Sequence, residues 1–563
     1  MGDSKRDRTH GPLSFDLTNR PWIPVLRQDG TQGEMSLREV FAHAGSLRQV
    51  IGDVPTQDFA LLRLLLALAH DALRGPADID AWTGLWADAD CFAPLEPYLD
   101  AHQERFDLLH PVTPFFQVPE LRTIRGNIAS LNRIVADVPN GQPFFSARMP
   151  SVERLSFAEA ARWVVHTHAY DTSGIKTGVA GDDRVKDGKV YPLGVGWAGS
   201  LGGIFVEGGT LRETLLLNLV AANEGGLERP ARDLPAWRRE PSGPGAGPVR
   251  QPSGRCDLYT WQTRRLRLDY DVSGVTGVVL GYGDPLAPRN LHACEPMTAW
   301  RRSEVQEKKL GQVPVYLPLE HDPGRTLWQG LSSLMMDRPG AAAGSEAASR
   351  MRPGVLEWVS RLVTSGVLPH HFQIRARAVT AVYGTQQSVI DEIIDDDLSI
   401  SAGLLHQQNR ALAEQATGAV TDAKNAVNVF SDFAADLTRT TGADGEAARA
   451  QARDLGFSAV DAPFRVWLSR LADTEDADRD RDWWRQELYR LFSHLGDQML
   501  AAAGDAEWKG RITATAKGTV WLNSAYVDGW FRYRLTAALS SPSSSNSSAS
   551  KAPTGSGAEE ALS

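Results

Sequence analysis

A change in composition near residue 390 constrains the fold of this chain more than any other sequence feature. Before it, proline and glycine recur throughout; after it they become scarce, and alanine, leucine, aspartate and arginine dominate. Helices favour the second composition, because proline removes a backbone donor and glycine is costly in a helix interior. Long helices are therefore predicted at residues 401–436, 462–472, 482–503 and 526–539, and four such helices favour an up-and-down bundle.

The part of the chain before this bundle has mixed character. Apolar periodicity predicts helices at residues 58–73, 157–168, 326–337 and 354–366, and β-like runs occur at 272–281 and 372–382. The fold class is therefore α+β. We expect a large mixed globular domain at residues 15–392 and a four-helix bundle at 393–539. The polar segment 1–14 and the serine-rich tail 540–563 are predicted to be disordered.

Composition restricts the class and compartment of the protein. The chain has 563 residues, 42% of them hydrophobic and 23% charged, with a formal net charge of -10. These values are typical of a soluble globular protein, and the charge argues against a generally basic nucleic-acid coat but not against a local basic face. The cysteines, Cys91, Cys256 and Cys294, form no C-x-x-C pair, which argues against a disulfide framework and a structural zinc site.

The remaining sequence features favour a cytoplasmic protein. The first ten residues are polar and charged, unlike a signal peptide. No apolar run reaches membrane-spanning length, so no membrane association is expected.

The run AYDTSGIKTG at residues 169–178 is the most informative local pattern. Two glycines bracket three residues, Ile175, Lys176 and Thr177. Glycine permits positive φ and close approach of the backbone to another molecule, so N–H groups, an ammonium and a hydroxyl here can face a polyanion. A flexible surface loop is the competing interpretation. A P-loop is excluded, because that motif requires glycine directly before the lysine, between a strand and a helix.

The sequence shows no clear set of catalytic residues. The histidine pairs 166/168 and 370/371 lack the i, i+4 spacing of a helical zinc site, so a structural or surface role is favoured. There is no G-x-S-x-G elbow and no Rossmann fingerprint. The acidic run at 391–397 could hold a cation, although a solvated helix N-terminus is the more ordinary interpretation. A metal-dependent hydrolase using these residues stays open as an alternative, as does a helical scaffold without nucleic-acid contacts.

Several stretches together resemble one family. They are WIPV at 22–25, ALLRLLLA at 60–67, FFQ at 115–117, AYDTSGIKT at 169–177, ETLLLN at 213–218, LYTWQTRR at 258–265 and EPMTAW at 295–300. Each stretch is weak alone. In this order and spacing they resemble the CasA family, the large subunits of the type I-E CRISPR Cascade complex, over about residues 15–538.

The resemblance implies a non-enzymatic subunit of an RNA-guided surveillance complex in antiviral defence. The implied partners are the other Cascade subunits, the CRISPR guide RNA, double-stranded target DNA with its PAM, and a helicase-nuclease that the subunit recruits. Guide pairing reads the target, while the protein reads the PAM, in this family from the minor groove, and a wedge then starts R-loop formation. Some members carry a cysteine zinc cluster in the middle of the chain. This sequence keeps only Cys256 and Cys294 there, so no metal or cofactor is expected.

The resemblance also assigns DNA-binding residues. The PAM loop comprises Gly174, Ile175, Lys176 and Thr177. The minor groove offers a sparse and degenerate pattern, which suits backbone groups and short side chains on a glycine loop. The wedge, which would unstack the first target pair, is Gln387.

Further positions follow from the same resemblance. Gln386 is the base-contacting neighbour of the wedge, where the family more often has asparagine; an ordinary polar turn is the alternative for both glutamines. The minor-groove finger is Arg289, the only lysine or arginine between residues 281 and 300. The loop near the guide RNA and the PAM, residues 137–145, contains Asn140 and Gly141.

Overall fold

The structure is a computed structural model that describes residues 13–136, 151–222, 232–335, 349–406, 409–471, 474, 476–515 and 518–540. Contacts divide the chain into two compact units, Met1–Leu368 with Ile374–Leu398, and Pro369–Gln373 with Ser399–Ser563. Each unit is treated by itself below. Asn140 and Gly141 lie outside the described residues, as do nearly all of the two terminal segments for which disorder is predicted.

The first unit mixes short sheets with helices. Its strands are β1 (Ile23–Arg27), β2 (Gln32–Met35), β3 (Leu47–Val50), β4 (Lys176–Thr177), β5 (Lys189–Val190), β6 (Ile204–Glu207), β7 (Arg264–Asp271), β8 (Gly274–Tyr282), β9 (Trp300–Arg302), β10 (Tyr316–Pro318), β11 (Arg350–Met351), β12 (Gln373–Tyr383) and β13 (Ile390–Ser401), the last two with their outer ends in the second unit. They form the sheets β2-β1-β3, β10-β9-β11 and β13-β12-β6 and the pairs β4-β5 and β7-β8.

Helices fill the space around these sheets. They are α1 (Leu37–Ala42), α2 (Pro55–Ala72), α3 (Ile79–Ala87), α4 (Leu95–His102), α5 (Phe157–Tyr170), α6 (Leu211–Asn218), α7 (Arg255–Tyr259), α8 (Glu304–Leu310), α9 (Leu331–Met335) and α10 (Gly354–Thr364). The 3₁₀ turns are η1 (Gln103–Phe106), η2 (Leu131–Arg133), η3 (Ala236–Arg238), η4 (Leu327–Gly330), η5 (Thr385–Gln387) and η6 (Ala402–Leu405), of which η6 lies in the second unit.

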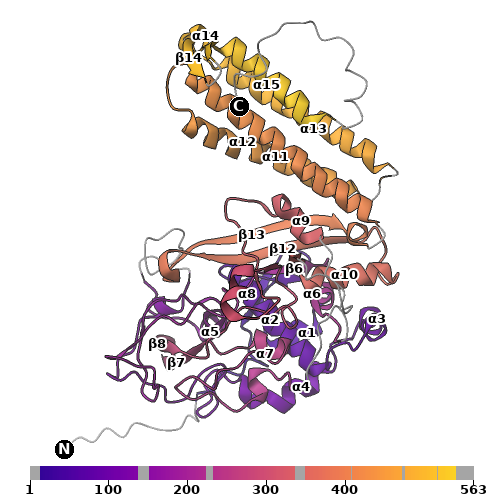
Figure 1. Ribbon diagram of the computed structural model, residues 1–563. Helices are drawn as coiled ribbons and strands as arrows, with labels where there is room; N and C mark the ends of the chain where they lie inside the picture. The colour runs from indigo at the N-terminus through magenta and orange to yellow at the C-terminus, as the bar shows by residue number, and fades with distance from the viewer. Residues whose placement is uncertain are drawn as a thin grey trace, which may run out of the picture. The chain divides into compact units, whose positions relative to one another are not determined.

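The helix α2 lies inside the first unit (Figure 1). Pro55 occupies its first turn, where a missing N–H costs nothing. Leucine and alanine make up most of the rest of the helix, and a helix that is apolar on all sides is a buried one. Arg63, a fully buried charge in the middle of the helix, pairs with Glu295 at 3.1 Å and lies over the ring of Phe59. The helix predicted at 58–73 is thereby confirmed.

The acidic run at 391–397 is a strand and not a solvated helix N-terminus, and the helix predicted to begin at residue 401 begins at Arg410. The expected domain boundary between 392 and 393 falls inside this strand, β13, which runs beside β12 (Figure 1). Asp395 and Asp397 are two positions apart and so lie on one face of the strand, where each is paired with an arginine of β12. Arg377 pairs with Asp395 at 2.7 Å and Arg375 with Asp397 at 2.8 Å. Cross-strand ion pairs stabilise a strand that local composition alone would not favour.

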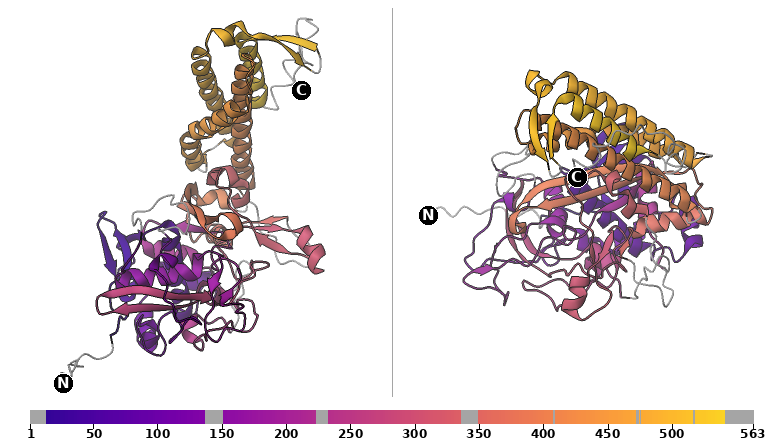
Figure 2. Two further views of the ribbon diagram at one scale, coloured as in Figure 1. Left: turned by 90° about the vertical axis from the view of Figure 1, so that its left-hand side faces the viewer. Right: turned by 45° about the horizontal axis from the view of Figure 1, so that its top comes forward.

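The second unit contains the bundle that the sequence predicts. Its long helices are α11 (Arg410–Arg439), α12 (Glu446–Arg470), α13 (Ala477–Ala501) and α15 (Ser524–Leu539), with α14 (Asp505–Lys509) and the hairpin β14 (Arg511–Thr515) and β15 (Gly518–Leu522) between the last two. Figure 2 shows the helices lying alongside one another, with the yellow hairpin projecting at one end. The hairpin was not foreseen, and α12 begins earlier than predicted.

Aromatic side chains fill the centre of the bundle. Phe433 and Phe531 stack with ring centroids 4.5 Å apart, and Phe464 meets Trp484 edge-on at 5.6 Å. Trp484 is fully buried, whereas its neighbour Trp483 is 48% exposed. Adjacent positions on a helix point about 100° apart, so only one of two consecutive tryptophans can face the core.

Candidate nucleic-acid interface

The predicted glycine loop begins directly after α5 and ends in a small hairpin. Lys176 and Thr177 form β4, which pairs with β5. Ile175 is 52% exposed and Thr177 is exposed, whereas the side chain of Lys176 is only 9% exposed. The loop therefore presents its apolar residue, its hydroxyl and its backbone to solvent, and turns its lysine inward.

An inward ion pair holds this lysine. The Lys176 ammonium lies 2.6 Å from Asp171 Oδ2, and Arg264 Nε donates to the same carboxylate oxygen. Arg264 also donates to the backbone carbonyls of Asp171 and Thr172. Burial lowers the pKa of Lys176 to about 8, and the neighbouring Asp171 carboxylate opposes that shift. The ion pair of Lys176 with Asp171 therefore stabilises the loop.

The two glycines serve different purposes. Neither adopts positive φ, so the expected left-handed backbone is absent at both. A Cβ at Gly178 would lie 2.5 Å from Val185 Cγ1, which makes glycine necessary for packing there. A Cβ at Gly174 would meet only Ser388 Cβ, at 4.0 Å. The backbone N–H groups of Gly174 and Ile175 donate to no residue in the described part of the chain.

The predicted glutamine turn connects β12 to β13. Gln386 and Gln387 both adopt left-handed φ, 57° and 55°. This conformation is uncommon for residues other than glycine, and two in succession store strain that persists only where the surroundings enforce it. The turn is closed by the Gln387 N–H, which donates to the Gly384 carbonyl at 2.8 Å. Both glutamines are exposed, and their amide side chains have no hydrogen-bond partner among the described residues.

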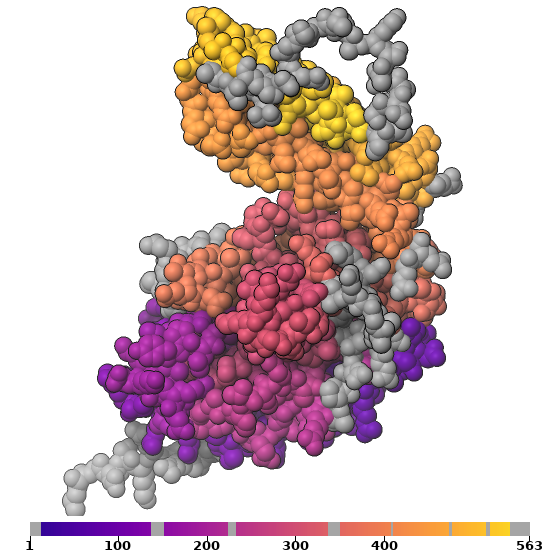
Figure 3. Space-filling view, in the orientation of Figure 1, coloured from indigo at the N-terminus to yellow at the C-terminus, as the bar shows by residue number. Residues whose placement is uncertain are grey.

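The structure brings the loop and the turn together. The Ser173 N–H donates to the Gln387 carbonyl at 2.7 Å. In Figure 3 the orange tip of the β12–β13 connection lies against the purple surface that contains the loop. Between them is a hollow of about 220 Å³, lined by Arg133, Asp171, Thr172, Gly174, Ile175, Lys176, Ser388 and Val389. Two segments that lie far apart in the sequence are thus neighbours in the structure.

Two residues beneath this site are ones that sequence analysis did not single out. Arg264 lies in the LYTWQTRR stretch, and that membership was the available signal. Tyr282, at the end of β8, donates its hydroxyl to the Gly174 carbonyl at 2.8 Å. No sequence pattern marked Tyr282 as a support of the loop.

The predicted minor-groove finger lies apart from these contacts. Arg289 is exposed, and no interaction in the described part of the chain connects it to the hollow. Its neighbour Asn290 has φ 56° and is fastened to Tyr316, donating to its carbonyl at 2.9 Å and accepting from its N–H at 2.7 Å. These two hydrogen bonds fix the backbone next to the exposed side chain of Arg289.

The histidines have structural surroundings, as the sequence favours. His166 Nε2 lies 2.9 Å from the Thr56 hydroxyl, and His168 Nε2 lies 2.9 Å from the Phe116 carbonyl. Burial lowers the pKa of His166 to about 3 and that of His168 to about 4, so both are neutral near pH 7. Within the described residues, no three His, Cys, Asp or Glu side chains are grouped as a metal site.

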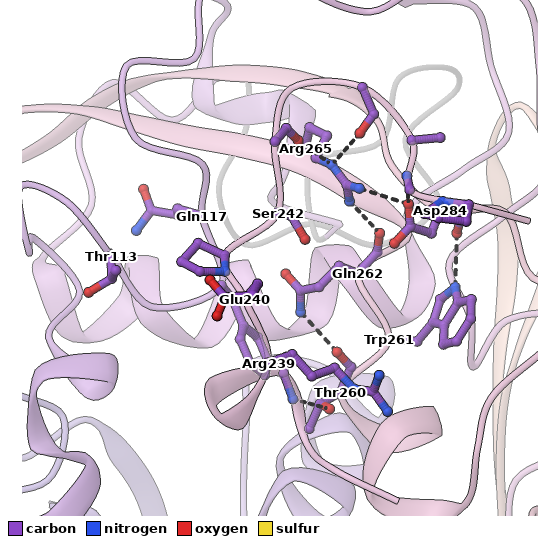
Figure 4. A pocket seen from close by; sticks show the side chains of 18 of the residues that line it. Thr113, Gln117, Arg239, Glu240, Ser242, Thr260, Trp261, Gln262, Arg265 and Asp284 are labelled. Carbon is purple, nitrogen blue, oxygen red and sulfur yellow. Dashed lines mark hydrogen bonds and ion pairs between the residues drawn. The ribbon is translucent and has the colours of Figure 1, made fainter. Parts of the chain in front are cut away.

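A larger cavity, of about 680 Å³ (Figure 4), shares no lining residue with the hollow. Five arginines and five acidic residues line it, so its charges balance. Arg265 donates to Asp284 at 2.7 Å and to the Gly243 carbonyl at 2.8 Å, and Arg239 pairs with Asp257 at 3.1 Å. None of the predicted site residues lines this cavity.

The fold and site define a two-part α+β and helical-bundle protein with an exposed loop and a strained polar turn beside a basic hollow. The chain belongs to the family of CRISPR-associated protein Cse1, whose model matches residues 16–495. No helix among the described residues is long and apolar enough to cross a membrane.

Three relatives illustrate the similarity. The crystal structure of Thermobifida fusca Cse1 is 53% identical, with a TM-score of 0.86 over 93% of this chain and 98% of that one. The CasA/Cse1 protein of Thermus thermophilus is 28% identical over 356 residues, 61% of this chain and 64% of that relative's length. A chain of a CRISPR RNA-guided surveillance complex, 17% identical, has the same fold with a TM-score of 0.66 over 93% of this chain and all of that one.

Proposed function

We propose that this chain is the large subunit of a type I-E CRISPR RNA-guided surveillance complex, acting in antiviral defence without catalytic chemistry of its own. Membership of the Cse1 family supports this proposal, as does a fold shared with a chain of such a complex. Its role there is to recognise the PAM in double-stranded DNA from the minor groove. Its partners are the other Cascade subunits, the guide RNA, the target duplex and a recruited helicase-nuclease.

The loop supplies groove contacts from its backbone. The unengaged N–H groups of Gly174 and Ile175 are donors, and donors are what the acceptor-rich floor of the minor groove requires. The exposed hydroxyl of Thr177 adds a short polar group. Lys176 fixes the loop, because its ammonium is paired with Asp171. Its positive charge also favours a bound polyanion.

The turn supplies the wedge. Gln387 projects from a strained, exposed turn, and strain of this kind is concentrated at functional sites. Its backbone is hydrogen-bonded to the loop, so a PAM held by the loop would have the first target pair beside the glutamine. Gln386 then offers a second amide to a base edge. Unstacking that pair starts R-loop formation.

Two further contacts complete the proposal. Arg289 is the minor-groove finger, and its exposure and the fixed backbone of Asn290 support a role in binding an external anion. Asn140 and Gly141, outside the described residues, belong to the loop near the guide RNA.

The hydrolase alternative has less support. Two of the acids on which it depends are paired with Arg375 and Arg377, and His166 and His168 are buried against protein partners. No residue of the acidic run lines the hollow or the larger cavity.

The observation that carries the proposal is the hydrogen bond that joins loop and turn, from Ser173 to Gln387. The test is duplex binding by the assembled complex, with and without this chain, on matched DNAs that differ only in the PAM. We expect PAM-dependent binding only when the chain is present. Equal binding to both DNAs with the chain present would contradict the proposal.

A further inference from the structure

Arg133 is an exposed arginine at the edge of the hollow, and no described residue pairs with it. It ends η2, and buried residues on either side of it anchor the segment: Leu131 is fully buried and Ile134 nearly so. Its guanidinium has no hydrogen bond or ion pair with any described residue. It lines the same hollow as Gly174, Lys176 and Ser388.

Positive charge around the hollow exceeds negative charge. Asp171 is the carboxylate in the lining, and it is already shared by Lys176 and Arg264. Arg133 adds a third cation, close enough to the lysine to help lower the pKa of Lys176, behind the larger effect of burial. Among the lining residues, two cations against one carboxylate leave a net charge of +1 when the lysine is protonated, with Arg264 as a further cation outside the lining, and an anion is the complementary ligand. The larger cavity, with its balanced charges, offers no such excess.

The hollow also has the space for one phosphate group and an arginine to bind it. A volume of about 220 Å³ is many times what one water molecule needs, and it is enough for a phosphodiester group. Arginine matches phosphate geometry with two parallel donors.

We propose that this hollow is a phosphate subsite, in which Arg133 binds one backbone phosphate of the target DNA at the point where the loop and the glutamine turn meet. The inference rests on the proposed function, because the phosphate belongs to the target duplex that the proposed function places at this site. A phosphate fixed in the hollow would hold the sugar–phosphate backbone still while the adjacent base pair is unstacked. Phosphate contacts position a duplex and carry no sequence information, so Arg133 serves register and not PAM choice.

The test is a scan with single methylphosphonates, which are uncharged, along each DNA strand beside the PAM. It uses the complete complex with wild-type chain, Arg133→Ala, Arg133→Lys and the control Arg20→Ala, an exposed arginine far along the sequence from the site. With wild type and Arg20→Ala, neutralising one phosphate should weaken binding roughly tenfold; with Arg133→Ala the same change should have almost no effect. Arg133→Lys should recover part of the loss, and the salt dependence of Arg133→Ala should fall by about one unit of slope.

Three outcomes would overturn the subsite. One is the absence of any phosphate position whose effect disappears in Arg133→Ala. Another is an unchanged salt slope. The third comes from a parallel scan of the guide RNA: disappearance only for a neutralised phosphate in that RNA would assign Arg133 to RNA. Two further variants distinguish failure of the subsite from failure of the proposed function: Gly174→Val, measured for PAM-dependent binding, and Gln387→Ala, measured for R-loop formation. If these are impaired and Arg133→Ala is not, only the subsite is wrong; if none is impaired, the proposed DNA site is wrong.

Discussion

The backbone N–H of Ser173 donates a 2.7 Å hydrogen bond to the carbonyl of Gln387. It links the loop proposed to read the PAM to the turn proposed to open the duplex. Because both partners are backbone atoms, substitution of the Gln387 side chain leaves the link in place. Reading and opening can therefore be tested separately by side-chain variants on either side of this bond.

The first prediction concerns the surface of the loop. Gly174→Val should weaken binding to PAM-bearing duplex by roughly tenfold, because a β-branched side chain would separate the loop backbone from the groove floor. Folding should be nearly unaffected, since a Cβ at this position meets only Ser388 at 4.0 Å. Binding is measured by titrating the assembled complex with duplex, and folding by thermal melting of the isolated chain.

Gly178→Val is the matched contrast. A Cβ there would clash with Val185, so this variant should melt at a lower temperature.

Guide RNA assembly should survive Gly174→Val. Unchanged PAM-dependent binding by that variant would show that the loop does not approach DNA.

The second prediction concerns pH. Burial lowers the pKa of Lys176 to about 8, against an ordinary value near 10.5. The ammonium is therefore present below about pH 8 and is lost as pH rises through that value. DNA is an anion and favours the protonated form, so duplex affinity should fall by roughly threefold to tenfold between pH 7 and pH 9. Lys176→Met should have weaker binding at pH 7 and a flat profile, because Asp171 keeps Arg264 as its partner. An identical pH slope for both proteins would remove Lys176 as the cause.

The third prediction concerns the finger. Arg289→Ala should reduce affinity for duplexes broadly, by about 1 kcal/mol, and lower the slope of log affinity against log salt by about 0.9. The loss should be similar for DNAs with and without a PAM if the contact is to phosphate. Arg20→Ala, another exposed arginine, serves as the control and should leave the slope unchanged. If the salt slope of Arg289→Ala equalled that of wild type, Arg289 would not contact DNA.

The sequence was sufficient for the broad fold, and its failures have a common physical cause. The bundle and α2 follow from composition and apolar periodicity, which are local properties. The strand β13 does not, because the arginines that neutralise Asp395 and Asp397 lie on the neighbouring strand. Within one segment those acids favour a solvated helix end; the tertiary ion pairs reverse that preference.

The site shows the same division. Gly174 and Gln387 were assigned as candidate site residues through the family resemblance, but their proximity was not predicted, since no local pattern reports a contact between residues so far apart in the chain. The inward position of Lys176 depends on Asp171 and Arg264, and Arg264 comes from another strand. Arg133 has no motif around it and is identified only by the hollow that it lines.

The last prediction concerns Gln387 and distinguishes docking from opening. PAM engagement comes first and duplex opening second, and a wedge acts at the second step. Unstacking the first pair costs on the order of a few kcal/mol, part of which an inserted side chain can offset. Gln387→Ala should therefore slow R-loop formation on linear duplex while leaving initial PAM engagement nearly intact. A target with mismatched bases beside the PAM needs no wedge and should restore the rate, and negative supercoiling should restore it in part.

A glycine variant shows whether any defect comes from the side chain or from the turn. Gln387 has φ 55°, a conformation that glycine adopts freely and alanine does not. If the Ala defect arose from a distorted turn, Gln387→Gly would behave like wild type; if it arose from the missing amide, both variants would be equally slow on paired DNA and equally rescued on pre-melted DNA. The measurement is R-loop kinetics on the two targets for wild type and both variants. An equal defect on paired and pre-melted targets would exclude a wedge and leave Gln387 as a PAM contact or a structural turn residue.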